Sequence, residues 1–190
     1  MPAYVALKNE YEKLYATCVI APEHAAAVAK VAAQVMLGKV RYEFACAQLL
    51  GVPWYFMGII HMMEGNCNFN THLHNGDSLK TRTVHVPRGR PATGTPPFTW
   101  EASAKDAMVY EGFANVSPWN LPIMLYRLET YNGWGYRHHA ICSPYLWSFS
   151  NHYTKGKYTA DGKYDPNAVS AQVGAAVLLK YMETNKLITL

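Results

Sequence analysis

The sequence predicts a mainly α-helical protein with a small irregular or β-like lobe, folded as one domain over residues 1–190. Three observations support this prediction. Apolar residues recur at helical spacing near the N-terminus, residues 53–60 form an apolar segment typical of a buried helix, and Gly, Asn, Pro and Thr dominate between residues 65 and 97. A chain of 190 residues is also long enough to bury a core.

Periodic apolar residues, with Gly and Pro at the expected helix ends, predict the first three helices. An amphipathic helix opens the chain, because apolar residues recur at helical spacing at Tyr4, Leu7, Tyr11, Leu14 and Cys18. A second helix begins at Pro22-Glu23, follows an alanine-rich segment to Leu37 and is capped at its C-terminus by Gly38. A third covers roughly residues 40–50 and stops at Gly51.

The fourth predicted helix ends at a lone carboxylate. Pro53 suits its first turn, and the segment "WYFMGII" is apolar on every side, which is typical of a buried helix. Glu64 follows at its C-terminal end. Desolvation there raises the pKa of a carboxyl group, which is what a general acid working near neutral pH requires.

A turn-rich segment follows the fourth helix. Only "TRTVHV" (81–86) alternates in the manner of a strand or hairpin. Asp77 lies in a polar Asn-Gly-Asp turn, where we expect its carboxylate to stay ionised. Two carboxyl groups in contrasting environments, Glu64 and Asp77, are typical of glycoside cleavage, although Asp77 also fits ordinary turn chemistry.

The second half of the chain predicts three more helices. Thr99 is the expected N-cap of the first, with Glu101 in its first turn. Ser117-Pro118 opens the next, which ends near Asn132-Gly133. The segment "GKYTADGKYDP" (156–166) is predicted to be a polar loop, and Asp165-Pro166 opens a last helix that reaches Glu183.

The amino-acid composition indicates which classes of binding partner to expect. The net charge is +4, from 17 Lys and Arg against 13 Asp and Glu, without a clustered basic face, so we expect no nucleic-acid binding. A mildly basic protein suits an anionic polymer such as bacterial cell wall. Fourteen Tyr and five Trp favour a groove that stacks on sugar rings.

The cysteines and the N-terminus predict the compartment. Cys18, Cys46, Cys67 and Cys142 form no CxxC pair, so we expect free thiols in a reducing compartment. The N-terminus lacks the layout of a signal peptide, and the longest apolar run is about half of a membrane span. We therefore expect synthesis in the cytoplasm without stable membrane insertion.

Two groups of residues resemble the lysozyme-like superfamily. Glu64 with Asn68-Phe69 after it, and "YNGWGYR" from Tyr131 to Arg137, resemble goose-type lysozymes and soluble lytic transglycosylases. The strings "NFNTHLHNGDSLKTRTVHVPRGRP" and "SPYLWSFSNHYTKGKY" are similar to leaderless phage and prophage endolysins. Two departures stand out: Gly65 replaces the usual Ser, and Trp134 is inserted among the small residues of the tyrosine motif.

The resemblance implies a fold, an activity and site residues. It implies a lysozyme-like helical domain with a groove, and a muramidase that cleaves the β-1,4 bond between N-acetylmuramic acid and N-acetylglucosamine. Glu64 is the implied general acid, and Asp77, with Thr83, positions water or stabilises charge. The implied sugar-binding residues are Asn68, Tyr131, Asn132, Gly133, Trp134, Gly135 and Tyr145.

Three alternatives stay open. If Asp77 only supports the structure, Glu64 acts alone in a lytic transglycosylase that forms 1,6-anhydro-muramic ends. Histidines at 61, 72, 74 and 85, together with Glu64, would suit a zinc or manganese hydrolase, although the HExxH pattern is absent. A non-catalytic carbohydrate-binding module would use the Tyr and Trp residues alone.

The expected partners follow from the muramidase interpretation. We expect peptidoglycan glycan strands as substrate, no cofactor or metal, and a monomer. A holin-type partner would release the protein from the cytoplasm to the cell wall. Arg137, His138 and His139 are interpreted as a solvated patch.

Overall fold

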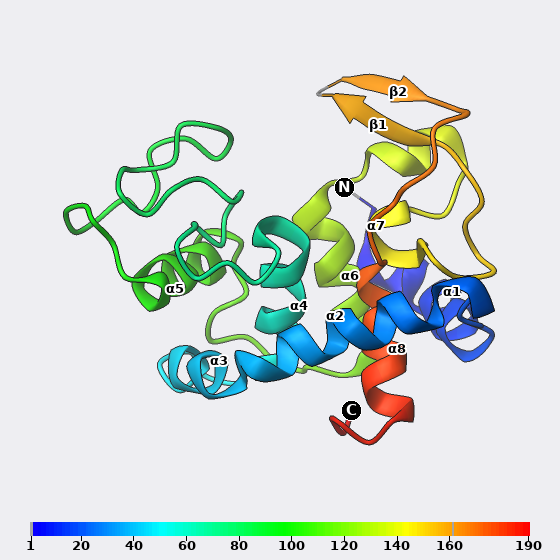
Figure 1. Cartoon of the computed structure of the whole chain (residues 1–190), viewed down its shortest axis with the longest axis horizontal. Coiled ribbons are helices and arrows are strands. Elements are labelled where there is room, and N and C mark those ends of the chain that lie inside the picture. Colours follow the sequence, from blue (N-terminus) through cyan, green and yellow to red (C-terminus); the bar gives the residue numbers. More distant parts are fainter. Residues whose placement is uncertain (1, 161) are drawn as a thin grey trace. The chain divides into compact units, whose positions relative to one another are not determined.

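The protein is mainly helical, with one small antiparallel sheet (Figure 1). The computed structural model describes residues 2–160 and 162–190. Its α-helices are α1 Tyr4–Ala16, α2 Ala25–Leu37, α3 Lys39–Cys46, α4 Trp54–Gly65, α5 Trp100–Tyr110, α6 Leu121–Asn132, α7 Pro144–Trp147 and α8 Ala175–Thr184. Two 3-10 helices, η1 Pro22–His24 and η2 Gly135–His139, and two strands, β1 Lys157–Ala160 and β2 Lys163–Asp165, complete the described elements. Within the described ranges, no helix has both the length and the apolar character needed to cross a membrane.

The chain divides into two compact units. The terminal unit contains Met1–Ala32 and Asn120–Leu190, and the central unit contains Ala33–Trp119. One boundary falls inside α2, and the other falls between Trp119 and Asn120, just before α6.

The central unit packs α3 against α4 and α5. Its core gathers around the buried ring of Tyr42, which contacts His61, Phe69 and Trp100. Gly38 does not adopt the left-handed conformation expected of a C-terminal cap, since its φ is −85°. A Cβ at Gly38 would lie 2.5 Å from the Tyr42 ring, so the glycine is explained by close packing.

Helix α4 agrees with its prediction. Pro53 is its N-cap, and its residues from Phe56 to Met63 are all buried. Asn66 ends the helix in the left-handed region, with φ 49°. Glu64 therefore lies in the last turn of a buried helix, as the sequence predicts.

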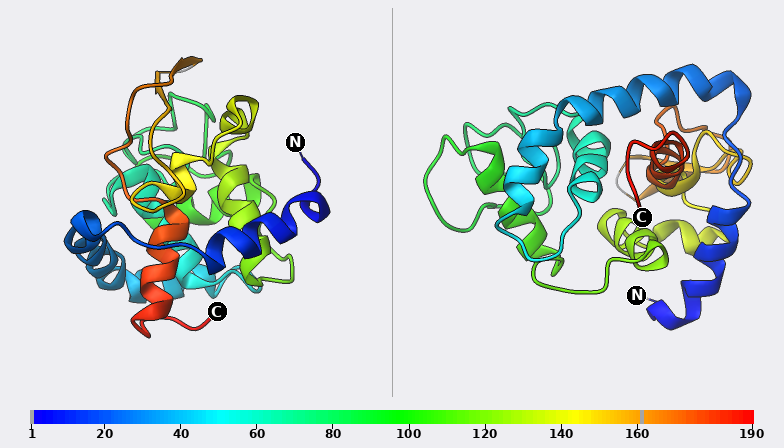
Figure 2. Two further views of the ribbon diagram at one scale, coloured as in Figure 1. Left: turned by 90° about the vertical axis from the view of Figure 1, so that its right-hand side faces the viewer. Right: turned by 90° about the horizontal axis from the view of Figure 1, so that it is seen from below.

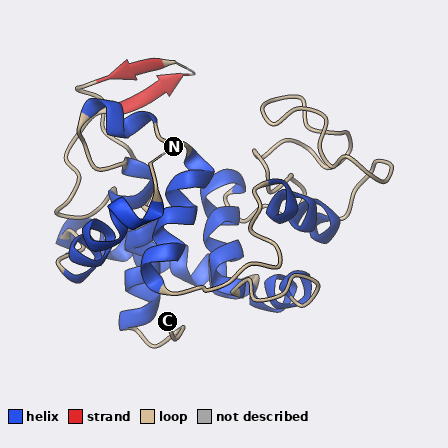
Figure 3. Ribbon diagram, turned by 180° about the vertical axis from the view of Figure 1, so that it is seen from behind, coloured by secondary structure: helices blue, strands red, loops and turns tan. Residues whose placement is uncertain are grey.

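The segment between α4 and α5 runs almost wholly as loop (Figure 3). Its one isolated bridge joins Thr71 to Ser78. The strand expected at residues 81–86 is wrong, because Thr83 closes a local loop by bonding Arg90 and Pro87, and Val84 and Val86 point outward with 60% and 86% exposure. Residues 81–86 do alternate in the manner of a strand, but their backbone does not pair with another strand.

The terminal unit packs α1 against α6, and α7 against α6 and α8 (Figure 2). Helix α6 begins at Leu121 and not at Ser117, because the Asn120 side chain accepts a hydrogen bond from Ile123 N and caps it. Helix α8 begins at Ala175 and not at Pro166. Asp165 instead ends β2 and accepts a hydrogen bond from Asn167 N in a turn.

The loop predicted at residues 156–166 contains a β-hairpin. Strands β1 and β2 pair antiparallel, with Lys157 opposite Asp165 and Tyr158 opposite Tyr164. The strands are only four and three residues long, which is too short for a clear alternation of apolar and polar residues.

Candidate functional site

The loop that carries Asp77 folds back onto the helix end that carries Glu64. Gly76 has a φ of +77°, and a Cβ there would lie 2.6 Å from the main-chain carbonyl oxygen of Glu64. His72 closes the turn, since its N–H donates to Asp77 O at 2.6 Å and its carbonyl accepts from Gly76 N at 2.9 Å. Only glycine combines that φ with that approach, so the turn fixes Asp77 beside the end of α4.

The helix end leaves no room for the serine usual in lysozyme-like proteins. A Cβ at Gly65 would lie 2.8 Å from Thr71 Oγ1. That hydroxyl donates to Asn68 O, also at 2.8 Å. Thr71 thus places a hydroxyl where a serine side chain at position 65 would begin. Glu64 is half-buried, and its own carbonyl and the next residue, Gly65, are both in close contact with the following loop.

Asp77 is a well-bound carboxylate. Its Oδ2 accepts hydrogen bonds from Val84 N at 2.8 Å and His85 N at 3.0 Å, and its Oδ1 contacts His85 Nδ1 at 2.7 Å. Burial by itself raises the pKa of Asp77, but the hydrogen bonds from His85 and Val84 outweigh it, so the pKa lies below its ordinary value. Asp77 is therefore negatively charged at neutral pH.

The hydroxyl of Thr83 is engaged within its own loop. It donates to Pro87 O at 2.5 Å and accepts from Arg90 N at 2.8 Å, and the residue is only 2% exposed. Its backbone also bonds Gly89 and Arg90. These hydrogen bonds give Thr83 a structural role in holding its own loop together.

Asn68 is exposed beside the end of α4 and organises the local turn. Its Oδ1 accepts from the backbone and side-chain nitrogens of Asn70, at 3.1 and 3.2 Å. Its carbonyl accepts from both the N–H and the hydroxyl of Thr71. The Asn68 side chain lies on the surface, where a ligand could reach it.

The histidines have protein partners. His61 is fully buried between Tyr42 OH at 3.0 Å and Trp100 Nε1 at 3.1 Å. His72 contacts Ser103 and Thr81, and His74 contacts Asp106. In the described ranges, no three His, Cys, Asp or Glu side chains group in a way that could hold a metal ion. The geometry thus links the histidines to core packing and loop anchoring.

The tyrosine motif lies at the end of α6 in the terminal unit and lines a cavity. The cavity has a volume of about 530 Å³ and is lined by Asn132, Gly135, Tyr136, Tyr158, Thr159, Ala160 and Gly162. Gly133 has a φ of +91° with open space around it, whereas a Cβ at Gly135 would lie 3.0 Å from the Tyr158 ring. Gly135 is therefore explained by contact with the hairpin rather than by a ligand.

The other predicted sugar-binding residues of this unit lie outside that lining. Trp134 packs on Tyr126, with ring centroids 5.2 Å apart. Tyr131 lies in the last turn of α6, and Tyr145 is half-buried on α7. The structure thus brings Asn132 and Gly135 together at one cavity, and it explains Trp134 by packing.

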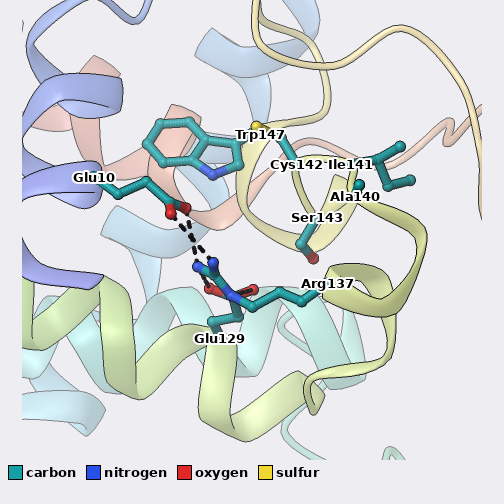
Figure 4. Close-up of a pocket in the computed structure, with 8 residues that line it drawn as sticks. All are labelled: Glu10, Glu129, Arg137, Ala140, Ile141, Cys142, Ser143 and Trp147. Atoms are coloured by element: carbon teal, nitrogen blue, oxygen red, sulfur yellow. Dashed lines mark hydrogen bonds and ion pairs between the residues drawn. The ribbon is translucent and has the colours of Figure 1, made fainter. Parts of the chain in front are cut away.

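Arg137 belongs to a buried ion pair and not to a solvated patch (Figure 4). Its Nε and Nη2 contact Glu129 Oε1 and Oε2 at 2.9 and 2.7 Å, and Glu129 is 2% exposed. Glu10 contacts the same guanidinium at 3.1 Å, and the Tyr11 hydroxyl donates to Glu129. His138 and His139 are exposed, as expected.

Sequence reasoning missed two features of the site. Glu129 falls in the last turn of α6, where a carboxylate usually faces solvent, so only the later Arg137 hints at its burial. Tyr158 falls in a segment that looks like a polar loop. The available signal was the Asp-Gly dipeptide ending at Gly162, flanked by tyrosines, which is typical of a hairpin.

No protein-family model, curated protein or solved structure matches the chain.

Proposed function

We propose that this protein is a peptidoglycan hydrolase of the muramidase type, with Glu64 as general acid. The observation that carries the proposal is the packing of the Asn-Gly-Asp turn on the carbonyl of Glu64. It places an ionised carboxylate, Asp77, in the loop beside a half-buried glutamate at the end of a buried helix. Glycoside cleavage uses two carboxyl groups in such contrasting environments.

The chemistry assigns one task to each group. Glu64 donates its proton to the glycosidic oxygen as the bond to the anomeric carbon breaks, and the sugar develops oxocarbenium character. The negative charge of Asp77 opposes the positive charge of that transition state, or orients the attacking water through its hydrogen-bonded loop. Water completes the reaction by adding to the anomeric carbon, and the proton that it loses passes through solvent to restore Glu64.

One observation favours a second candidate, a lytic transglycosylase. Both oxygens of Asp77 are already engaged by Val84 and His85, which suits a structural carboxylate. Glu64 would then act alone, and the 6-hydroxyl of muramic acid would attack in place of water. The product would be a 1,6-anhydro end.

The sugar-binding part of the proposal rests on the cavity lined by Asn132 and Gly135. Peptidoglycan glycan strands are the proposed substrate. Access to the cell wall through a membrane lesion made by a holin-type partner stays a prediction from the sequence.

Mass spectrometry of digested peptidoglycan tests the proposal. Purified cell walls are incubated with the protein, and the soluble fragments are separated and weighed. Reducing muramic ends support the hydrolase, and anhydro ends, lighter by the mass of water, support the transglycosylase. A parallel digestion in saturating EDTA should release the same fragments. Loss of activity in EDTA that zinc or manganese restores would instead support the metallohydrolase.

A further inference from the structure

The ion pair of Arg137 borders a smaller cavity of the terminal unit (Figure 4). Its volume is about 250 Å³, which suits a small organic molecule or the end of a longer chain. Glu10 on α1, Glu129 on α6 and Arg137 on η2 all line it, so three elements distant in sequence contribute charged groups. The function proposed above uses none of these residues.

The charged part of the cavity has an excess of negative charge. Nη2 of Arg137 contacts Glu10 Oε1 at 3.1 Å and Glu129 Oε2 at 2.7 Å. The described lining thus carries two carboxylates and one guanidinium. Cys142 also lines the cavity, and burial raises the pKa of its thiol. Glu10 and Glu129 raise that pKa further, and Arg137 lowers it by less than either carboxylate raises it. A cation is therefore favoured over an anion here.

Ser143 adds an unused hydrogen-bonding group to the same cavity. The residue is 3% exposed, and its hydroxyl has no hydrogen-bond partner among the residues that the structure describes. A serine directly before a helix commonly caps it, but the Ser143 hydroxyl makes no capping bond to α7. Figure 4 shows this hydroxyl directed towards the side of the cavity that holds Arg137 and Glu129. Because a buried hydroxyl without a partner is unfavourable, a ligand that bonds to it gains free energy.

The other side of the cavity is apolar. Ala140, Ile141 and the indole ring of Trp147 line it. A cationic end beside apolar side chains matches an alkylammonium ion, whose N–H groups can donate to the carboxylates and to Ser143. A metal ion is a poorer match, because within residues 2–160 and 162–190 no three His, Cys, Asp or Glu side chains group in a way that could hold one.

We propose that this cavity binds the ammonium group of a primary amine. Glu10 and Glu129 supply the negative charge, and the Ser143 hydroxyl accepts a hydrogen bond from the ammonium. The proposal goes beyond glycoside cleavage and does not depend on the role of Glu64. A free alkylamine and the terminal amino group of a lysine-type side chain share the required chemistry.

An NMR titration of the full, nitrogen-15-labelled chain with propylammonium chloride tests the site. The amide signals of residues 140–143 should shift, with a dissociation constant on the order of 1 mM. The uncharged 1-propanol, which has the same number of heavy atoms, should bind at least about tenfold more weakly. Nα-acetyl-lysine N-methylamide distinguishes the two sources. Tighter binding than propylammonium assigns the site to a side-chain amine, and weaker binding assigns it to a free amine.

Ser143→Ala tests the hydroxyl. The substitution should weaken the binding of propylammonium about tenfold, as expected for the loss of a hydrogen bond to a charged group. Removing an unpartnered buried hydroxyl should leave the melting temperature unchanged or higher. A serine with a purely structural role would not alter the affinity.

Glu10→Gln tests the charge and has a closely matched control. It should weaken binding about threefold, because the Glu10 side chain is 45% exposed and its charge is partly screened. Glu12 lies on the same helix with a side chain that is 46% exposed, but it does not line the cavity. Glu12→Gln makes the same change in net charge and should bind like the parent.

Three results would each overturn the proposal. They are equal binding of propylammonium and 1-propanol, parent-like affinity in a folded Ser143→Ala chain, and equal effects of Glu10→Gln and Glu12→Gln. Lysis of cell walls by the same preparations is measured separately, so failure of this site leaves the proposed function in place.

Discussion

Gly76 lies directly against the main-chain carbonyl oxygen of Glu64. Its φ of +77° is one that residues with a side chain rarely adopt, and a Cβ there would come within 2.6 Å of that oxygen. The contact fixes the loop that carries Asp77 to the end of the helix that carries Glu64. In the proposed mechanism, this contact holds the segment that carries Asp77 beside the segment that carries Glu64.

Replacing Gly76 should therefore disturb both stability and activity. We expect Gly76→Ala to lower the free energy of unfolding by about 3 kcal/mol, because it combines an unfavourable φ with a backbone collision. Gly89→Ala is the matched control, since Gly89 has a φ of +79° and nothing within 4 Å of its Cβ position. It should cost about 1 kcal/mol and retain wall lysis. Similar losses in the two variants, measured by urea unfolding and turbidity, would contradict the role of the contact.

Asp77→Asn should reduce lysis less than Glu64→Gln does. The amide keeps the shape of the side chain but loses the charge, and we expect a fall of about one to two orders of magnitude. Burial raises the pKa of Asp77, but the hydrogen bonds from His85 and Val84 outweigh it and leave the pKa below its ordinary value, so the carboxylate stabilises the fold above the unfolded pKa of about 4. That stabilisation is lost as the pH falls through the folded pKa. Asp77→Asn should lose less stability than the wild type as the pH falls below 5. A glycosyl ester trapped on Asp77 would contradict its assignment as a non-covalent group.

His61 should make the central unit sensitive to acid. The Trp100 indole can only donate, so His61 Nε2 must accept its hydrogen bond and the ring must be neutral. Burial lowers the pKa of His61 from 6.5 to about 4. The unfolded chain then binds more protons than the folded chain between these pH values, and stability falls by about 3 kcal/mol as the pH drops from 6.5 towards 4.

His61→Gln provides the comparison, because an amide can accept from Trp100 and donate to Tyr42 without titrating. The variant should lose less stability than the wild type over that pH range in urea unfolding. Identical pH profiles would exclude His61 as the responsible group.

The Glu129–Arg137 pair should be important for folding. Glu129→Gln removes the buried partner of the partly buried Arg137 guanidinium and leaves the more exposed Glu10 beside it, and we expect a loss of about 3 kcal/mol. Glu10→Gln is the control and should cost about 0.5 kcal/mol, since its side chain is 45% exposed. Thermal unfolding of the two variants measures the difference. A loss for Glu129→Gln as small as that for Glu10→Gln would show that the pair contributes little.

The sequence predicts the elements that local patterns determine. Helix α4 and the position of Glu64 follow from Pro53 and an unbroken apolar segment, and the Thr99 cap follows from its side chain. The first residues predicted for α6 and α8 are wrong for the same reason. Pro118 and Pro166 are compatible with a first helical turn, but Asn120 caps α6 further along and Asp165 belongs to a strand.

Contacts between distant residues could not be predicted in this way. Gly38 looks like a helix cap, but the ring of Tyr42 explains it. Gly135 looks like a ligand contact, but its close approach to the Tyr158 ring explains it. Arg137 looks solvated in the sequence, but in the structure it contacts Glu129 and Tyr11. Each of these residues takes its role from a partner that the local sequence does not identify.

The Glu64→Gln variant tests whether Glu64 is the general acid. The substitution preserves the shape of the side chain and removes the transferable proton. Lysis of purified cell walls should fall on the order of a thousandfold or more, while the melting temperature stays within about 2 °C of the wild type. Wild-type lysis by a fully folded Glu64→Gln protein would contradict the account.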